Sequence, residues 1–138
     1  MERAGEGWWV RLAALCGLAA VIAGAFGAHG VTDPMAKELL RTASTYGLVH
    51  ALATIGAVLL ARQTGRSAGV APGLFLAGEL LFCGSLYALA LGAPRWVGAI
   101  TPLGGLSFMG GWAALVFSRG RPAPLASSVD GVDPSLSP

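Results

Sequence analysis

The chain has 138 residues, of which 54% are apolar and 12% charged, and its formal net charge is +2 at pH 7. Soluble domains usually have about 25% charged residues. The composition and the mean hydropathy of +0.67 therefore exclude a soluble globular domain. The small net charge, without any basic block, excludes a nucleic-acid-binding surface.

Four long apolar segments fill most of the chain, and each is close to the roughly 20 residues that a helix needs to cross a bilayer. They cover residues 8–28, 46–61, 70–91 and 97–117. We therefore predict an all-α fold, an integral membrane four-helix bundle formed by residues 1–117. The first segment is longer than the apolar core of a signal peptide, which has about 7–15 residues, so we expect it to be a span.

The polar stretch after the first span predicts the start of a helix. Asp33 can cap a helix whose first residue is Pro34. From residue 35 to residue 45, apolar side chains recur at helical spacing with charged residues between them. We predict that residues 35–45 form a short interfacial helix before the second span, which on its own is slightly short.

The remaining segments connect the spans or follow them. Residues 62–68 are polar and predict a short connection, and residues 92–96 predict a turn that contains Pro94 and Arg95. Residues 118–138 are rich in Pro, Ser, Gly and Asp and have no apolar period. We expect them to form a disordered cytoplasmic tail.

Basic residues near the span ends predict the orientation, because cytoplasmic loops carry the excess of Lys and Arg. One side holds six of them: Arg3, Arg11, Arg62, Arg66, Arg119 and Arg121. The other side holds three: Lys37, Arg41 and Arg95. Both termini are therefore expected in the cytoplasm.

With this orientation, polar side chains from all four spans gather toward the outer leaflet. The candidate cluster consists of His29, Tyr46, His50, Ser85, Tyr87 and Thr101, with Arg95 and Pro102 nearby. Three interpretations remain open: an interhelical hydrogen-bond network, a ligand or lipid-headgroup site that opens outward, and ligation of a metal or haem by the two histidines.

Glu79 is a separate candidate, because it lies about halfway along the third span. An ionisable residue near the middle of the bilayer is by default a candidate for function, here proton or ion translocation. The alternative is a protonated carboxyl that is hydrogen-bonded to a neighbouring helix. No lysine or arginine lies at its depth.

Small residues four apart occur in every span and allow close helix packing, within one bundle or at a homo-oligomer face. Examples are Ala20 with Gly24, Ala23 with Gly27, Gly47 with Ala51, Gly84 with Ala88, and Gly110 with Ala114. Cys16 and Cys83 are expected to be buried as small apolar side chains.

Motifs of catalysis are absent from the sequence, including GxSxG, HExxH, a phosphate-binding glycine loop and a carboxylate pair. We therefore expect no enzymatic activity, no catalytic residues, no metal site and no cofactor.

Four short motifs, in order over about residues 12–117, resemble the domain-of-unknown-function 423 family of YgdD-like small membrane proteins. They are residues 24–30 (GAFGAHG), Tyr46 with residues 50–52 (HAL), residues 82–87 (FCGSLY), and residues 101–105 (TPLGG) followed by Phe108 and residues 111–112 (GW). The third motif differs at Cys83, where the family usually has serine. The resemblance implies a four-helix, multi-pass protein of the bacterial inner membrane without an established activity. Glu79 is outside the family pattern.

Together these features predict a structural or accessory membrane component. Its expected partners are the lipid bilayer and either a larger membrane complex or further copies of itself, and no nucleic acid. The alternative is a small transporter or channel-like protein that uses Glu79 and the outward-facing polar cluster.

Overall fold

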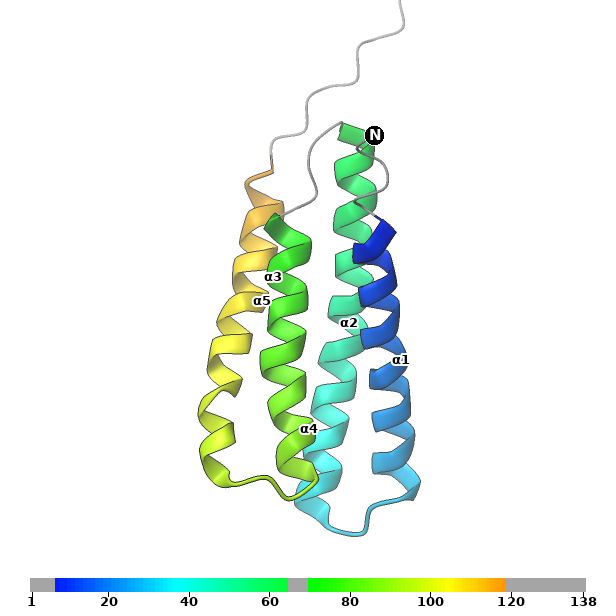
Figure 1. The fold of residues 1–138 in the computed structure, drawn as a ribbon, viewed down its shortest axis with the longest axis vertical. Coiled ribbons are helices and arrows are strands. Elements are labelled where there is room, and N and C mark those ends of the chain that lie inside the picture. Colours follow the sequence, from blue (N-terminus) through cyan, green and yellow to red (C-terminus); the bar gives the residue numbers. More distant parts are fainter. Residues whose placement is uncertain (1–6, 65–69, 119–138) are drawn as a thin grey trace, which may run out of the picture.

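The computed structural model describes residues 7–64 and 70–118, which form four long antiparallel helical segments (Figure 1). The first two are α1 (Gly7–His29) and α2 (Pro34–Thr64). The third is continuous from α3 (Val70–Gly78) through the π-helix η2 (Glu79–Cys83) into α4 (Gly84–Ala90). The fourth joins the 3₁₀ helix η3 (Arg95–Ala99) to α5 (Thr101–Val116).

All four segments are long and apolar enough to cross a membrane, and the described ranges contain no strand. This confirms the all-α prediction of four membrane-spanning helices. The turns at residues 30–33 and 91–94 lie at one end of the bundle, which we call the loop end (Figure 1). Gly7, Thr64, Val70 and Val116 lie at the opposite end, which we call the terminal end. The predictions for residues 65–68 and for the tail from residue 119 lie outside the described residues.

Helix α2 begins as the sequence predicts but continues without a break. The backbone N–H of Ala36 donates to Asp33 Oδ2 at 2.7 Å, so Asp33 caps a helix whose first residue is Pro34. The predicted lead-in is not a separate short helix: residues 35–45 form the first turns of one 31-residue helix. The reason is that Ala36 and Leu40 are buried on the same side as the span that follows.

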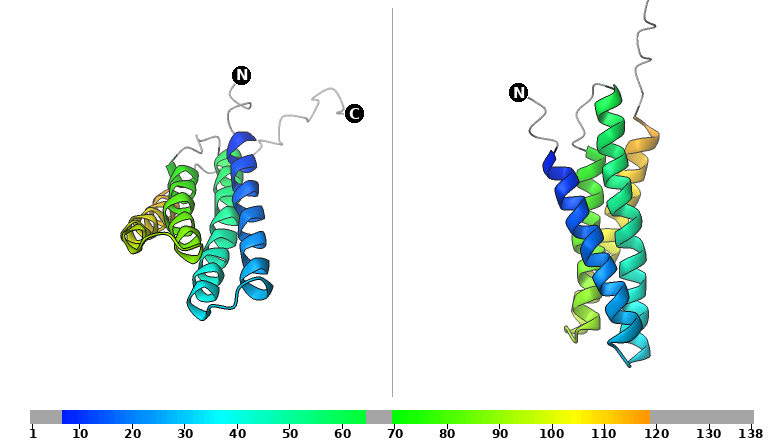
Figure 2. Two further views of the ribbon diagram at one scale, coloured as in Figure 1. Left: turned by 60° about the horizontal axis from the view of Figure 1, so that its bottom comes forward. Right: turned by 90° about the vertical axis from the view of Figure 1, so that its right-hand side faces the viewer.

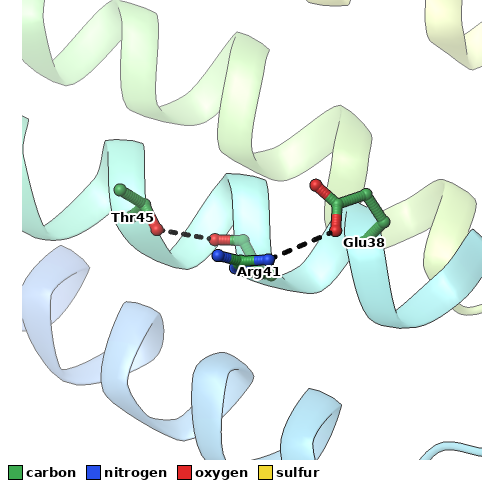
Figure 3. A network of polar contacts seen from close by, with 3 residues as sticks. All are labelled: Glu38, Arg41 and Thr45. Carbon is green, nitrogen blue, oxygen red and sulfur yellow. Dashed lines mark hydrogen bonds and ion pairs between the residues drawn. The ribbon is translucent and has the colours of Figure 1, made fainter.

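The opposite face of this lead-in is polar, as expected of an amphipathic segment (Figure 3). Arg41 lies 3.9 Å from the carboxylate of Glu38, and Thr45 Oγ1 donates to the Arg41 carbonyl at 2.9 Å. Both charged side chains are well exposed, so this ion pair contributes less than about 1 kcal/mol. This ion pair therefore does not determine the packing of the helix.

Small residues bring α1 and α2 into close contact along a stripe with alternating steps of three and four. A Cβ added at Gly24 would lie 2.6 Å from Ser44 Oγ, and one at Gly27 would lie 2.9 Å from Leu40 Cβ. Such steps are typical of left-handed antiparallel helix pairs. The stripe on α1 consists of Ala13, Gly17, Ala20, Gly24 and Gly27.

Glycine and phenylalanine alternate across the second pair, formed by α3–α4 and α5. Gly78 faces the ring of Phe108, Gly104 faces Phe82, and Gly111 faces Phe75. In each case a Cβ on the glycine would overlap the ring or backbone opposite. The aromatic rings therefore fill the space that the glycines leave, which brings the two helices together without loss of apolar contact.

Figure 2 shows the two antiparallel pairs, α1 with α2 and α3–α4 with α5. Helix α2 lies against α3, η2 and α4 and joins the pairs. The main core lies at this junction and contains Ala43, Ala57, Phe75, Cys83 and Phe108. Helices α1 and α5 are peripheral, and few of their residues are buried.

Candidate functional site

His50 lies near the midpoint of α2, deeper in the bundle than the sequence analysis placed it. Its ring is 5.7 Å from that of Phe75 and 6.2 Å from that of Trp112, measured between centroids. Both partners belong to the half of the bundle nearer the terminal end. His50 thus lies farther from the loop end than the sequence analysis expected, because the lead-in is part of α2 and occupies the half nearer the loop end.

Both ring nitrogens of His50 are in use. Trp112 Nε1, which can only donate, lies 3.2 Å from His50 Nε2, so Nε2 is the unprotonated nitrogen. The proton is therefore on Nδ1, which donates to the Tyr46 carbonyl at 2.8 Å. The ring also stacks on Phe108, with 3.5 Å between centroids. The imidazole is thus neutral and fixed between α2 and α5.

Tyr46 belongs to the same aromatic group, one helical turn from His50. Its ring lies 4.9 Å from that of Phe82 and 5.9 Å from that of His50, while part of the side chain remains exposed. These rings connect α2 with η2 and α5. They form an interhelical aromatic contact.

Ser85 and Thr101 form a second, separate pair nearer the loop end. Their hydroxyl oxygens are 2.7 Å apart, and Ser85 Oγ donates to the Phe82 carbonyl at 2.9 Å. Thr101 is then the donor to Ser85, which ties the start of α5 to α4. A ligand is not needed to satisfy either hydroxyl.

Two further serines that the sequence analysis did not select make the same kind of bond. Ser44 Oγ donates to the Ala20 carbonyl at 2.7 Å, and Ser107 Oγ donates to the Leu74 carbonyl at 2.6 Å. Each crosses between the helices of one pair. In the sequence, each of these serines is three residues from a glycine of the packed face: Ser44 from Gly47, and Ser107 from Gly104. This spacing could have indicated that both serines face a neighbouring helix.

Tyr87 and His29 lie apart from these groups. A Cβ added at Gly47 would lie 3.6 Å from the Tyr87 hydroxyl, so Tyr87 faces α2 on the side nearer α1. His29 is exposed at the last residue of α1. Among the described residues no group of three or more His, Cys, Asp or Glu is placed to hold a metal ion. The predicted cluster is therefore divided over four places.

Glu79 is 4% exposed, and neither carboxyl oxygen has a hydrogen-bond partner among the described residues. The Cys16 thiol faces it from α1 but does not meet hydrogen-bond geometry. The hydrogen bond to a neighbouring helix that the sequence analysis offered as an alternative is thus not formed. Glu79 is also the first residue of the π-helix, which no local sequence signal indicated.

An open depression of about 480 Å³ lies at the loop end, between residues 30–36 and the end of α4. Its lining is mostly apolar, with Phe26, Leu39 and Leu91 among its residues. The carboxylate in its lining, that of Asp33, already caps α2. The depression therefore shows no built site for a polar ligand.

Comparison with known proteins identifies the family. A family model described as protein of unknown function (DUF423) matches residues 23–105. The chain belongs to the DUF423 family. Its match begins in the glycine stripe of α1 and ends beside Gly104, so it includes most of the close helix contacts described above.

Relatives of the DUF423 protein occur in bacteria and in a yeast, and they are named UPF0382 membrane proteins. The relative from Staphylococcus haemolyticus is 38% identical over 80% of this chain and 93% of its own length. The relative from Haemophilus influenzae is 37% identical over 79% and 90%, and that from Schizosaccharomyces pombe is 40% identical over 76% and 95%. No solved structure matches the chain. This DUF423 protein is therefore a multi-pass membrane protein of a family without an established activity.

Proposed function

We propose that the protein is a structural or accessory component of its membrane, without enzymatic activity. The observation that carries the proposal is that the buried hydroxyl and imidazole groups join helices. Ser44, Ser85, Ser107 and His50 each bond to a group on another helix. Side chains that are hydrogen-bonded between helices stabilise one arrangement of the bundle, and their polar groups are not available to bind a substrate.

The peripheral position of α1 supports an accessory role. This helix contacts α2 closely and α3 only slightly, so its outer face is exposed. That face carries Leu15, Leu18 and Ile22, each more than half exposed. This apolar face can pack equally well against lipid, a partner subunit or a second copy of the chain.

We further propose that the protein lies in the bacterial inner membrane with both termini in the cytoplasm. Helices α1 and α5 have their chain ends at the same end of the bundle, as an even number of spans requires. The excess of arginine near that end in the sequence supports a cytoplasmic location for it. Reporter fusions after Phe117 and within residues 92–94 test this: the first should report cytoplasm and the second the outside.

Co-purification from the native membrane in a mild detergent tests the accessory role. The full chain should then be recovered with other membrane proteins at a reproducible ratio. Leu18→Ser places a hydroxyl on the exposed face of α1 and should reduce that ratio, whereas Ala13→Ser, on the face buried against α2, tests for nonspecific loss through unfolding. Recovery of the chain alone, at every mild detergent tried, would contradict the proposal.

A second candidate, a small transporter, is favoured by the unpartnered carboxyl of Glu79. It requires ion or proton flux into liposomes that contain the purified protein. Glu79→Gln, which keeps the size of the side chain, should abolish this flux. Flux that is equal in the variant and the wild type would reject Glu79 as the transport residue.

A further inference from the structure

Glu79 combines two unusual properties, full burial and the absence of a partner. Its side chain lies near the middle of the membrane-spanning bundle, and both oxygens are unsatisfied within the described residues. The lysine and arginine residues of the described ranges lie toward the helix ends: Arg11, Lys37, Arg41, Arg62 and Arg95. Both ring nitrogens of His50 are hydrogen-bonded to other groups. Within residues 7–64 and 70–118, no cationic side chain therefore neutralises this carboxyl.

The titratable groups that face Glu79 are all uncharged when protonated. Cys16 approaches from α1, and Cys83 and Tyr87 lie on the same side of η2 and α4. Helix α2 contributes the small surface of Gly47 near Cys83 and Tyr87. Two thiols and a phenol do not balance a negative charge, and an ionised carboxylate in such surroundings has lost its hydration without compensation.

The π-helix is an independent observation at the same residue. The N–H of Gly84 donates to the carbonyl of Glu79 in place of the usual α-helical bond. Such turns are rare and occur often at functional sites. With this wide turn, Gly78 and Phe82 both pack against α5, while Glu79 faces Cys16 of α1.

We propose that Glu79 is a proton-binding site, a carboxylic acid that holds its proton inside the membrane bundle. Its ligand is the proton itself. Cys16, which faces Glu79 from α1, is partly exposed, and α1 has little contact with α3. The site is independent of the proposed accessory role, because it requires no partner and no transport.

Labelling of the intact protein in lipid bilayers with dicyclohexylcarbodiimide tests the site. The acid proton moves to a nitrogen of the reagent and the carboxyl oxygen bonds to its central carbon. Transfer of the acyl group to nitrogen then gives a stable N-acylurea, so the peptide gains the whole mass of the reagent. We expect the adduct on Glu79 and at least tenfold less on Glu38, which is an exposed carboxylate beside Arg41.

Infrared difference spectra between the wild type and Glu79→Gln provide the second measurement. The wild type should show the carbonyl stretch of a protonated acid at neutral pH, shifted in D₂O, and the variant should lack it. Carboxylate bands in its place would overturn the proposal, as would an adduct on Glu38 without one on Glu79. Labelling requires only the wild-type chain, so the test stands even if Glu79→Gln does not fold.

Discussion

Gly104→Ala tests whether the glycine–phenylalanine contacts determine the packing of α5. A Cβ at position 104 would lie 2.7 Å from Phe82 Cβ and 2.8 Å from Phe82 Cα. Carbon atoms in good contact are about 3.5–4.0 Å apart, so the two helices would have to separate by roughly 1 Å. The obstacle includes backbone atoms of Phe82, which a change of rotamer does not remove.

The separation would also disturb two neighbouring contacts on the same face. Gly78 faces Phe108 at a similarly close approach, and the Ser85–Thr101 hydrogen bond, 2.7 Å long, lies one turn away. Overpacking a close-packed site costs about 1–3 kcal/mol, and loss of a hydrogen bond adds about 1 kcal/mol. The higher helix propensity of alanine offsets about 1 kcal/mol of this cost, so we expect Gly104→Ala to lower the free energy of unfolding by about 2 kcal/mol.

Thermal unfolding in a mild detergent, followed by circular dichroism, measures the effect. A loss of this size lowers the Tm by about 7 °C for a chain of this length. Gly105→Ala is the matched control, because its Cβ would lie 4.0 Å from the Phe82 ring and alanine favours a helix by about 1 kcal/mol. If both variants change the Tm equally, the close approach of the two helices at Gly104 is not what stabilises the bundle.

Three further predictions use the same unfolding measurement. Gly24→Ala should lower the free energy of unfolding by about 1–2 kcal/mol, because its Cβ would lie 2.6 Å from Ser44 Oγ. In a Ser44→Ala background the loss should be much smaller, and an unchanged loss there would contradict close contact between Gly24 and Ser44. Trp112→Phe should lower the free energy of unfolding by about 1 kcal/mol, and His50→Phe by about 2 kcal/mol, because His50 also donates to the Tyr46 carbonyl. The two effects should be non-additive, since both substitutions remove the bond between Trp112 Nε1 and His50 Nε2, and strict additivity would show that this bond is not formed. Glu79→Leu should raise stability by about 1–3 kcal/mol, because it removes an unsatisfied buried group, and a loss of stability would reveal a partner for the carboxyl.

Length and composition were sufficient to predict the four spans, because a bilayer requires apolar helices of a narrow range of lengths. The cap at Asp33 also followed from local chemistry. The continuity of α2 did not, because residues 35–45 suit either an interfacial helix or an extension of the span. Only the burial of Ala36 and Leu40 against the bundle distinguishes these alternatives.

The candidate site was harder to predict, because depth in a membrane does not specify the side of a helix. His50 and Tyr87 were assigned to one cluster by depth, yet His50 faces α5 and Tyr87 faces the side nearer α1. Glu79 was selected as an ionisable group halfway along a span, whereas its lack of a hydrogen-bond partner among the described residues depends on tertiary packing. The π-helix shifts the register of side chains there, and no residue type predicts it.

Native mass spectrometry of the protein released directly from its own membrane tests the accessory role most directly. It reports bound proteins, lipids and other ligands in a single measurement. We predict that the chain is detected in a complex with at least one other membrane protein, at fixed stoichiometry. A chain that is detected only as a monomer with lipid, or with a bound small-molecule substrate, would contradict it.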